Sequence, residues 1–318
     1  MNRRGFEMSF AWIFSIIVGA VIIFLALYAA SRLAQTERYA GDSAAAGQLN
    51  VLLQPLTTAG ETDSKPGNIS FPGAARILPY CTIEGTFGKQ EIRVATRSGV
   101  GKPWQEAGAA ASSSEKYLFA EKSVEGTSFY TLVRPLNLPF KMGDVIALWS
   151  ARYCFVNPPR EISDDIEELH LDASNFIIAA SSSACPAGST TVCFLGASGG
   201  TCAVSVDTAG QRVIKQRQTL FYEPALFYAA IVSDPALYEC QVQRMLKRGA
   251  TLAVLYREKS EFIAARSHTG CSAILQPALA AYAPLLQNAT SRQIPLIHAQ
   301  AQQIADSNTR LSCPLWRS

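Results

Sequence analysis

The stretch RRGFEMSFAWIFSIIVGAVIIFLALYAAS (residues 3–31) decides how the rest of the chain is interpreted. After Arg3 and Arg4 it contains 24 residues without a charge, from Met8 to Ser31. At about 1.5 Å per residue such a helix is roughly 36 Å long, enough to cross a hydrocarbon core of about 30 Å with some tilt. The apolar core of a secretory signal is shorter, about 7–15 residues. The stretch therefore predicts an uncleaved transmembrane helix, with a cleaved signal and filament-type processing as alternatives.

The charges beside this apolar run predict its orientation. Two arginines precede it within a few residues, whereas Arg32 and Arg38 follow it with Glu37 between them. Because positive charge is denser before the run, the positive-inside rule keeps the N-terminus in the cytoplasm. We therefore expect a cell-membrane protein that contacts the lipid bilayer through residues 8–31, with the bulk of the chain on the extracytoplasmic side.

The first residues also resemble a known family. Arg3-Arg4-Gly5-Phe6, followed by the apolar run, is similar to the start of type IV pilins. That resemblance implies processing after Gly5, a mature chain that starts at Phe6, and filament assembly through the apolar helix. Pilins carry a glutamate at the fifth mature position, where this chain has Phe10, and Glu7 would be the second mature residue.

A second resemblance covers both ends of the chain. The opening GFEMSFAWIFSIIVGAVIIFLALYAA (5–30), the stretch AAIVSDPALYECQVQRMLKR (229–248) and the ending CPLW (313–316) resemble uncharacterised archaeal single-pass membrane proteins with an exported domain. This resemblance implies an archaeal membrane protein. It brings no known activity with it.

The remaining sequence predicts an α+β fold. Gly41 is expected to interrupt the first helix, and Asp42 or Ser43 to cap a second one. The apolar face of this second helix is expected to consist of Ala45, Leu49, Leu52, Leu53 and Leu56, at spacings of three and four. Residues 57–75 are expected to form a linker because they are rich in Gly and Pro. Runs of β-branched and aromatic residues predict short strands in the centre, and Asp234-Pro235 opens a helical texture. The predicted segments are a cytoplasmic tip and transmembrane helix (1–33), a juxtamembrane helix and linker (34–78), a β-rich exported domain (79–230) and a C-terminal helical hairpin or small bundle (231–318).

Eight cysteines follow the apolar run, and an even number in a non-reducing compartment favours disulfides. Eight cysteines allow 105 connectivities, so the sequence does not determine the pairing. The best local pair is Cys193–Cys202, which flanks FLGASGGT between two predicted strands of a hairpin. Among Cys240, Cys271 and Cys313 we expect one pair that staples the helical region.

No pattern in the chain predicts catalysis, a metal or a cofactor. The G-x-S-x-G match at residues 196–200 precedes a predicted strand, where the nucleophile motif requires a helix. The histidines lack the spacing of a metal motif, and the acidic residues 164–168 lack the ligand pattern of a calcium loop. The net charge of +3 is too small and dispersed for a nucleic-acid surface. Two triplets, at Asn68 and Asn288, are glycosylation sequons in an exported chain.

The sequence thus predicts a membrane-anchored cell-surface protein with a structural or binding role, an unknown ligand, and either an unknown protein partner or self-assembly. A pilin-like filament subunit is the first alternative. An extracytoplasmic enzyme whose active site is assembled from distant residues is the second, because such a site leaves no local motif.

Overall fold

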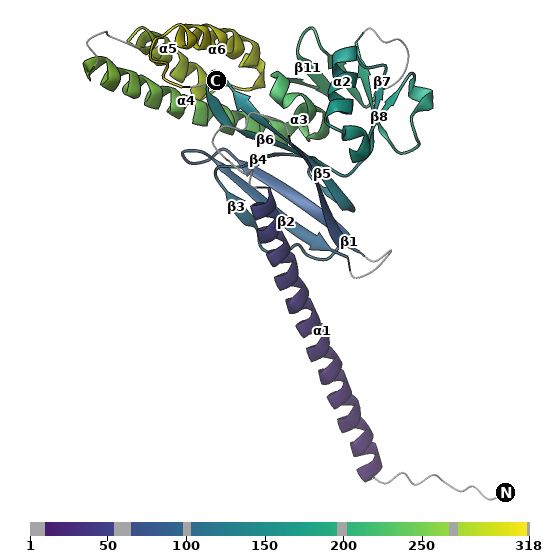
Figure 1. Ribbon diagram of the computed structural model, residues 1–318. Coiled ribbons are helices and arrows are strands. Elements are labelled where there is room, and N and C mark those ends of the chain that lie inside the picture. The colour runs from purple at the N-terminus through teal and green to yellow at the C-terminus, as the bar shows by residue number, and fades with distance from the viewer. Residues whose placement is uncertain (1–9, 54–64, 98–102, 196–201, 267–272, 317–318) are drawn as a thin grey trace, which may run out of the picture.

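The computed structural model describes residues 10–53, 65–97, 103–195, 202–266 and 273–316, and it has a mixed α+β architecture. A single long helix, α1 (Phe10–Leu52), begins the described chain. Its apolar N-terminal half stands apart from the other elements, and its last turns lie against a sheet (Figure 1). The most apolar 18-residue window of α1 has a mean hydropathy of 2.8, and none of that window is buried. We call residues 42–316 the head.

The first sheet has six strands in the order β3-β2-β1-β5-β6-β4. Its strands are β1 (Lys65–Thr82), β2 (Lys89–Thr96), β3 (Ala111–Ser113), β4 (Tyr117–Phe119), β5 (Val124–Asn137) and β6 (Lys141–Trp149). All neighbours are antiparallel except β4 and β6, which are parallel. Alternation along β2 buries Ile92 and Val94, and these residues form a core with Ala46 and Leu49 of α1. The end of α1 is thereby part of the hydrophobic core of the head.

The second sheet also has six strands, in the order β12-β11-β10-β9-β7-β8. Its strands are β7 (Tyr153–Val156), β8 (Phe176–Ala179), β9 (Thr190–Phe194), β10 (Val204–Asp207), β11 (Arg212–Lys215) and β12 (Gln218–Phe221). Helix α2 (Arg160–Glu168) and the 3₁₀ turns η1 (Leu171–Ser174) and η2 (Ser182–Ala184) connect its first strands. The neighbours β8-β7-β9-β10 are parallel, and β10-β11-β12 are antiparallel.

The C-terminal part of the head is helical, as the sequence predicts. Its helices are α3 (Phe227–Val232), α4 (Pro235–Arg266), α5 (Leu275–Gln287) and α6 (Ile294–Thr309), with 3₁₀ turns η3 (Pro224–Leu226) and η4 (Ser291–Gln293). Asp234 starts α4 by accepting hydrogen bonds from the backbone N–H groups of Ala236 and Leu237. Inside α4, a Cβ on Gly249 would come within 2.5 Å of the flexible end of the Met142 side chain of β6. The helix therefore approaches the first sheet closely at this glycine.

Three described disulfides join parts of the head. Cys193 is bonded to Cys202, the local pair that the sequence favours. Cys154 is bonded to Cys185. Cys240 of α4 is bonded to Cys81 of β1, 159 residues earlier, so it does not belong to the pair expected within the helical region. Cys313 is also disulfide-bonded, and Cys271 lies outside the described residues.

Two expectations about the first helix and the linker are wrong. Gly41 does not interrupt α1, because glycine costs only about 1 kcal/mol relative to alanine and the residues after it pack on the sheet. The expected linker at 57–75 contains the start of β1, which begins at Lys65. Pro66 is tolerated in a part of β1 that pairs with β5, and Pro72 lies in an irregularity between Ser70 and Ala75.

The hairpin expected around residues 193–202 is also wrong. β9 and β10 are neighbours, but they run parallel, with Val192 opposite Val204. The alternation of apolar residues predicts a strand and carries no information on its direction. The direction here follows from the whole sheet, in which β9 also runs parallel to β7.

Candidate functional site between the long helix and the first sheet

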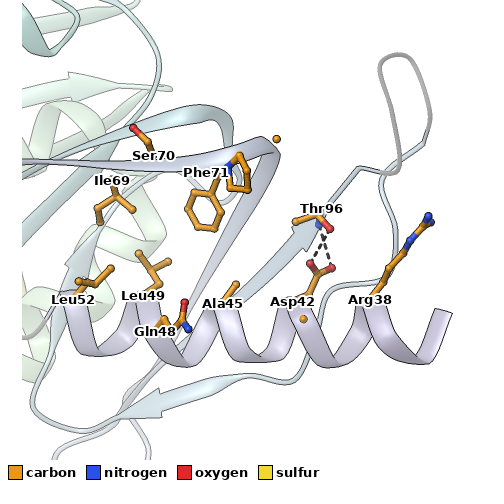
Figure 2. Close-up of a pocket in the computed structure, with 13 residues that line it drawn as sticks. Arg38, Asp42, Ala45, Gln48, Leu49, Leu52, Ile69, Ser70, Phe71 and Thr96 are labelled. Carbon is orange, nitrogen blue, oxygen red and sulfur yellow. Dashed lines mark hydrogen bonds between the residues drawn. The ribbon is translucent and has the colours of Figure 1, made fainter. Parts of the chain in front are cut away.

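A hollow with largely apolar walls lies where α1 meets β1. It is a groove of about 470 Å³, and a second hollow of about 390 Å³ shares Leu52, Ile69 and Ser70 with it. Figure 2 shows α1 along one side of this groove, and Ile69 and Phe71 of β1 facing it from the other side. We call the two hollows together the α1–β1 groove.

The helical repeat and the strand repeat together build the walls. Ala45, Leu49 and Leu52 are spaced by four and three residues, so they share one face of α1. Ile69 and Phe71 are two residues apart at the end of the regular part of β1, and Phe71 packs edge-on against Phe129 of β5. Leu49 is only 1% exposed, whereas Leu52 is 67% exposed at the open side. The groove is therefore apolar at its base and open to its surroundings.

A buried carboxylate fixes the end of the groove that is nearest the apolar half of α1. Asp42, 3% exposed, accepts a hydrogen bond from the hydroxyl of Thr96 at 2.8 Å and one from the Thr96 backbone N–H at 3.2 Å (Figure 2). The expectation that Asp42 caps a second helix is therefore wrong. The residue instead attaches α1 to the last residue of β2.

The next residue makes a second attachment. The hydroxyl of Ser43 accepts a hydrogen bond from the backbone N–H of Ala109 at 2.8 Å. Beside it, a Cβ on Gly108 would come within 2.4 Å of the Ser43 backbone nitrogen, so only glycine permits this approach. Asp42 and Ser43 together set the position of α1 along the sheet.

The first residues of β1 form the wall opposite α1, and in the described part of the chain they have a strand neighbour on one side only. Residues 65–70 of β1 pair with β5, and the pairing of β1 with β2 starts at Ala75. Among the described residues no strand lies on the other side of residues 65–70. Every second residue of this segment therefore directs its backbone N–H and C=O groups to an edge without a strand partner.

Chemically, the α1–β1 groove is suited to apolar groups. Its walls are aliphatic and aromatic, and polar side chains such as Arg38 and Gln48 lie exposed at its rim. Apolar walls with a few polar groups are typical of sites that hold an apolar ligand or side chain in a fixed orientation. No group of His, Cys, Asp and Glu residues suited to a metal occurs among the described residues.

Two charged side chains elsewhere in the head, Arg244 and Asp165, have structural partners. Arg244 of α4 donates hydrogen bonds to the backbone carbonyls of Phe87, Lys116 and Ser114, at 2.9–3.1 Å, and burial lowers its pKa to about 10. Asp165, one of the acidic residues weighed as a cation ligand, instead accepts hydrogen bonds from Arg134 and Tyr228. These contacts join elements of the head.

One titratable pair lies near the start of the helical region. His298 Nδ1 of α6 lies 3.1 Å from Glu223 Oε1. Burial raises the pKa of the Glu223 carboxyl above its ordinary value, although the neighbouring His298 opposes this change. The pair attaches α6 to the segment before α3.

The residues singled out from the sequence do not converge on one site. Gly5, Phe6 and Cys271 lie outside the described residues, and so does the whole G-x-S-x-G match at 196–200. Asn68 lies in β1 beside the α1–β1 groove, and Asn288 follows the last residue of α5. Sequence reasoning identified the apolar face of Ala45, Leu49 and Leu52. It missed the contact between Asp42 and Thr96, which are 54 residues apart.

Comparison of the chain with protein-family models, with curated proteins and with solved structures gives no match.

Proposed function

We propose that this protein is a single-pass membrane protein that holds its head at the cell surface, where the head has a binding role. The observation that carries the proposal is the continuity of α1. One unbroken helix contains both an exposed apolar segment and the residues that pack into the core of the head.

The length of α1 sets the distance between the head and the bilayer. The helix from Phe10 to Ser31 is roughly 33 Å long, which matches a hydrocarbon core of about 30 Å. Asp42 lies 11 positions after Ser31, which corresponds to roughly 16 Å of helix. Since no loop intervenes, the head is held at a fixed height above the membrane, with the α1–β1 groove along the helix that supports it.

Two features support an extracytoplasmic head. Arg3 and Arg4 precede the apolar segment, which favours a cytoplasmic N-terminus. The described disulfides all lie in the head, and disulfides persist in oxidising compartments. The binding role is assigned to the α1–β1 groove because it joins apolar walls to an open side, and its partner would be an apolar group of another protein or a small apolar molecule.

The test uses the full chain in its own membranes. We expect it to resist extraction at alkaline pH, and we expect protease added outside intact cells to remove the head. The same protease should leave a cytoplasmic marker protein intact. Release at alkaline pH, or a head that is cut only after the membrane is opened, would contradict the proposal.

A pilin-like filament subunit is the second candidate, because α1 joins a protruding apolar segment to the head in one helix. Processing after Gly5 would remove five residues, and the mature chain would begin at Phe6. The intact mass of the protein from its own membranes distinguishes the candidates. A chain that keeps Arg3 and Arg4 excludes processing after Gly5, and a chain that begins at Phe6 favours assembly through α1.

A further inference from the structure

The triplet Asn68-Ile69-Ser70 lies in the part of β1 that has one strand neighbour, β5, among the described residues. Because side chains alternate along a strand, Asn68 and Ser70 share one face and Ile69 points to the other. Ile69 packs against the core formed with α1, whereas Asn68 and Ser70 are exposed. The fold thus presents both polar residues of the sequon on the surface.

The free edge beside this triplet is a liability for an isolated protein. Unpaired N–H and C=O groups along a strand edge are a template for pairing with another chain, and natural proteins cover or block such edges. The described neighbours leave the edge of residues 65–70 without a strand. Asn68 and Ser70 also line the α1–β1 groove, so a group attached to Asn68 would stand at the rim of that groove as well as at the edge. Something that is bulky, polar and attached at this edge would prevent such pairing.

We propose that Asn68 is N-glycosylated and that its glycan covers the free edge of β1. In this reaction the Asn68 side-chain nitrogen forms a bond to the anomeric carbon of a lipid-linked oligosaccharide. The bond from that carbon to the lipid phosphate breaks, the phosphate leaves, and the amide loses one proton. The proposal rests on the extracytoplasmic head proposed above, because the acceptor must lie on the side of the membrane where the sugar is transferred.

The residue opposite Asn68 fits a sugar. In the pairing of β1 with β5, Asn68 lies opposite Tyr130, so their Cβ atoms are about 4.5–5.5 Å apart. The Tyr130 ring is half-buried and packs at 6.2 Å from Trp149, which holds it in place. Its accessible part provides an apolar surface on which the first sugar ring rests.

The second sequon has a different setting and serves as the comparison. Asn288 is exposed at the end of α5, and the Thr290 hydroxyl donates a 2.6 Å hydrogen bond to Gln293 in a capping box. Asn288 lies at a helix end, where a glycan would have no strand edge to cover.

The test is peptide mass spectrometry of the full chain purified from its own membranes. We expect carbohydrate mass on the Asn68 peptide in more than half of the molecules. Asn68→Gln should abolish it, and so should Ser70→Ala, which removes the hydroxyl that the sequon requires and keeps the asparagine. Asn288→Gln should leave the modification of Asn68 unchanged.

The outcomes separate this proposal from the one on which it rests. If external protease cuts the head but the Asn68 peptide carries no carbohydrate, the glycan proposal is wrong and the proposal of an extracytoplasmic head stands. A head that external protease cannot reach would overturn both proposals. We also expect Ser70→Ala molecules to self-associate more than wild type in sedimentation experiments. Equal sedimentation would overturn the role of the glycan at the edge.

Discussion

The hydrogen bonds between Asp42 and Thr96 should determine how firmly α1 is attached to the head. Asp42→Ala removes the acceptor of two hydrogen bonds at a buried position. A hydrogen bond to a charged group contributes about 1.5–3 kcal/mol, and the abandoned Thr96 N–H adds a penalty. We therefore expect the free energy of unfolding to fall by about 3 kcal/mol. Thr96→Val removes only the hydroxyl, and we expect it to cost about 1.5 kcal/mol.

The assay is urea unfolding of the full chain in lipid nanodiscs, followed by circular dichroism. The double variant should be little worse than Asp42→Ala alone, because Thr96 has lost its partner already. This corresponds to a coupling energy of about 1.5 kcal/mol, within the range found for residues in contact. Glu37→Ala, at an exposed position five residues earlier on α1, is the matched control and should change stability by less than about 0.5 kcal/mol. Wild-type stability of Asp42→Ala, or fully additive effects, would refute the reasoning.

Three further changes test the remaining contacts. Replacing Cys81 and Cys240 together by alanine opens a loop with a separation of 159 residues. We expect the free energy of unfolding in urea to fall by about 5 kcal/mol, and a fall of less than about 1 kcal/mol would contradict this. Arg244→Met leaves backbone carbonyls without a donor, and the free energy of unfolding should fall by about 3–5 kcal/mol in the same assay. An unchanged urea midpoint would show that water replaces the guanidinium. The raised pKa of Glu223 means that the folded state holds its proton more tightly, so this carboxyl lowers stability as pH rises through and above its ordinary value. Glu223→Gln should therefore gain stability relative to wild type between pH 4 and pH 7, and a constant difference would show that His298 fully compensates the burial.

The parts of the fold that were predictable follow from local patterns. The long charge-free run predicts the exposed segment of α1, and Asp234-Pro235 predicts the start of α4 within one residue. The spacing of Ala45, Leu49 and Leu52 predicts the face that lines the α1–β1 groove. Each of these signals is contained in a few consecutive turns, so it needs no knowledge of the partner element.

The parts that were not predictable depend on distant residues. Pro66 and Gly67 are typical of a linker, yet pairing with β5 makes them part of β1. Residues 144–156 have the texture of one strand, but the chain turns between Trp149 and Tyr153 and its two halves enter different sheets. The partner of Cys240 depends on how α4 lies on the first sheet. No local pattern contains these choices.

Two attachments within the head connect α1 to the distant helical region. Asp42 joins α1 to β2, and the Cys81–Cys240 bond joins β1 to α4. β1 and β2 are adjacent strands of one sheet, so an unbroken series of directional contacts leads from the apolar helix to the helical region. Because side-chain packing is close, a displacement of α1 relative to the sheet would require these contacts to rearrange or break. A partner bound in the α1–β1 groove would contact both α1 and β1. It would therefore favour one position of the helix relative to the sheet.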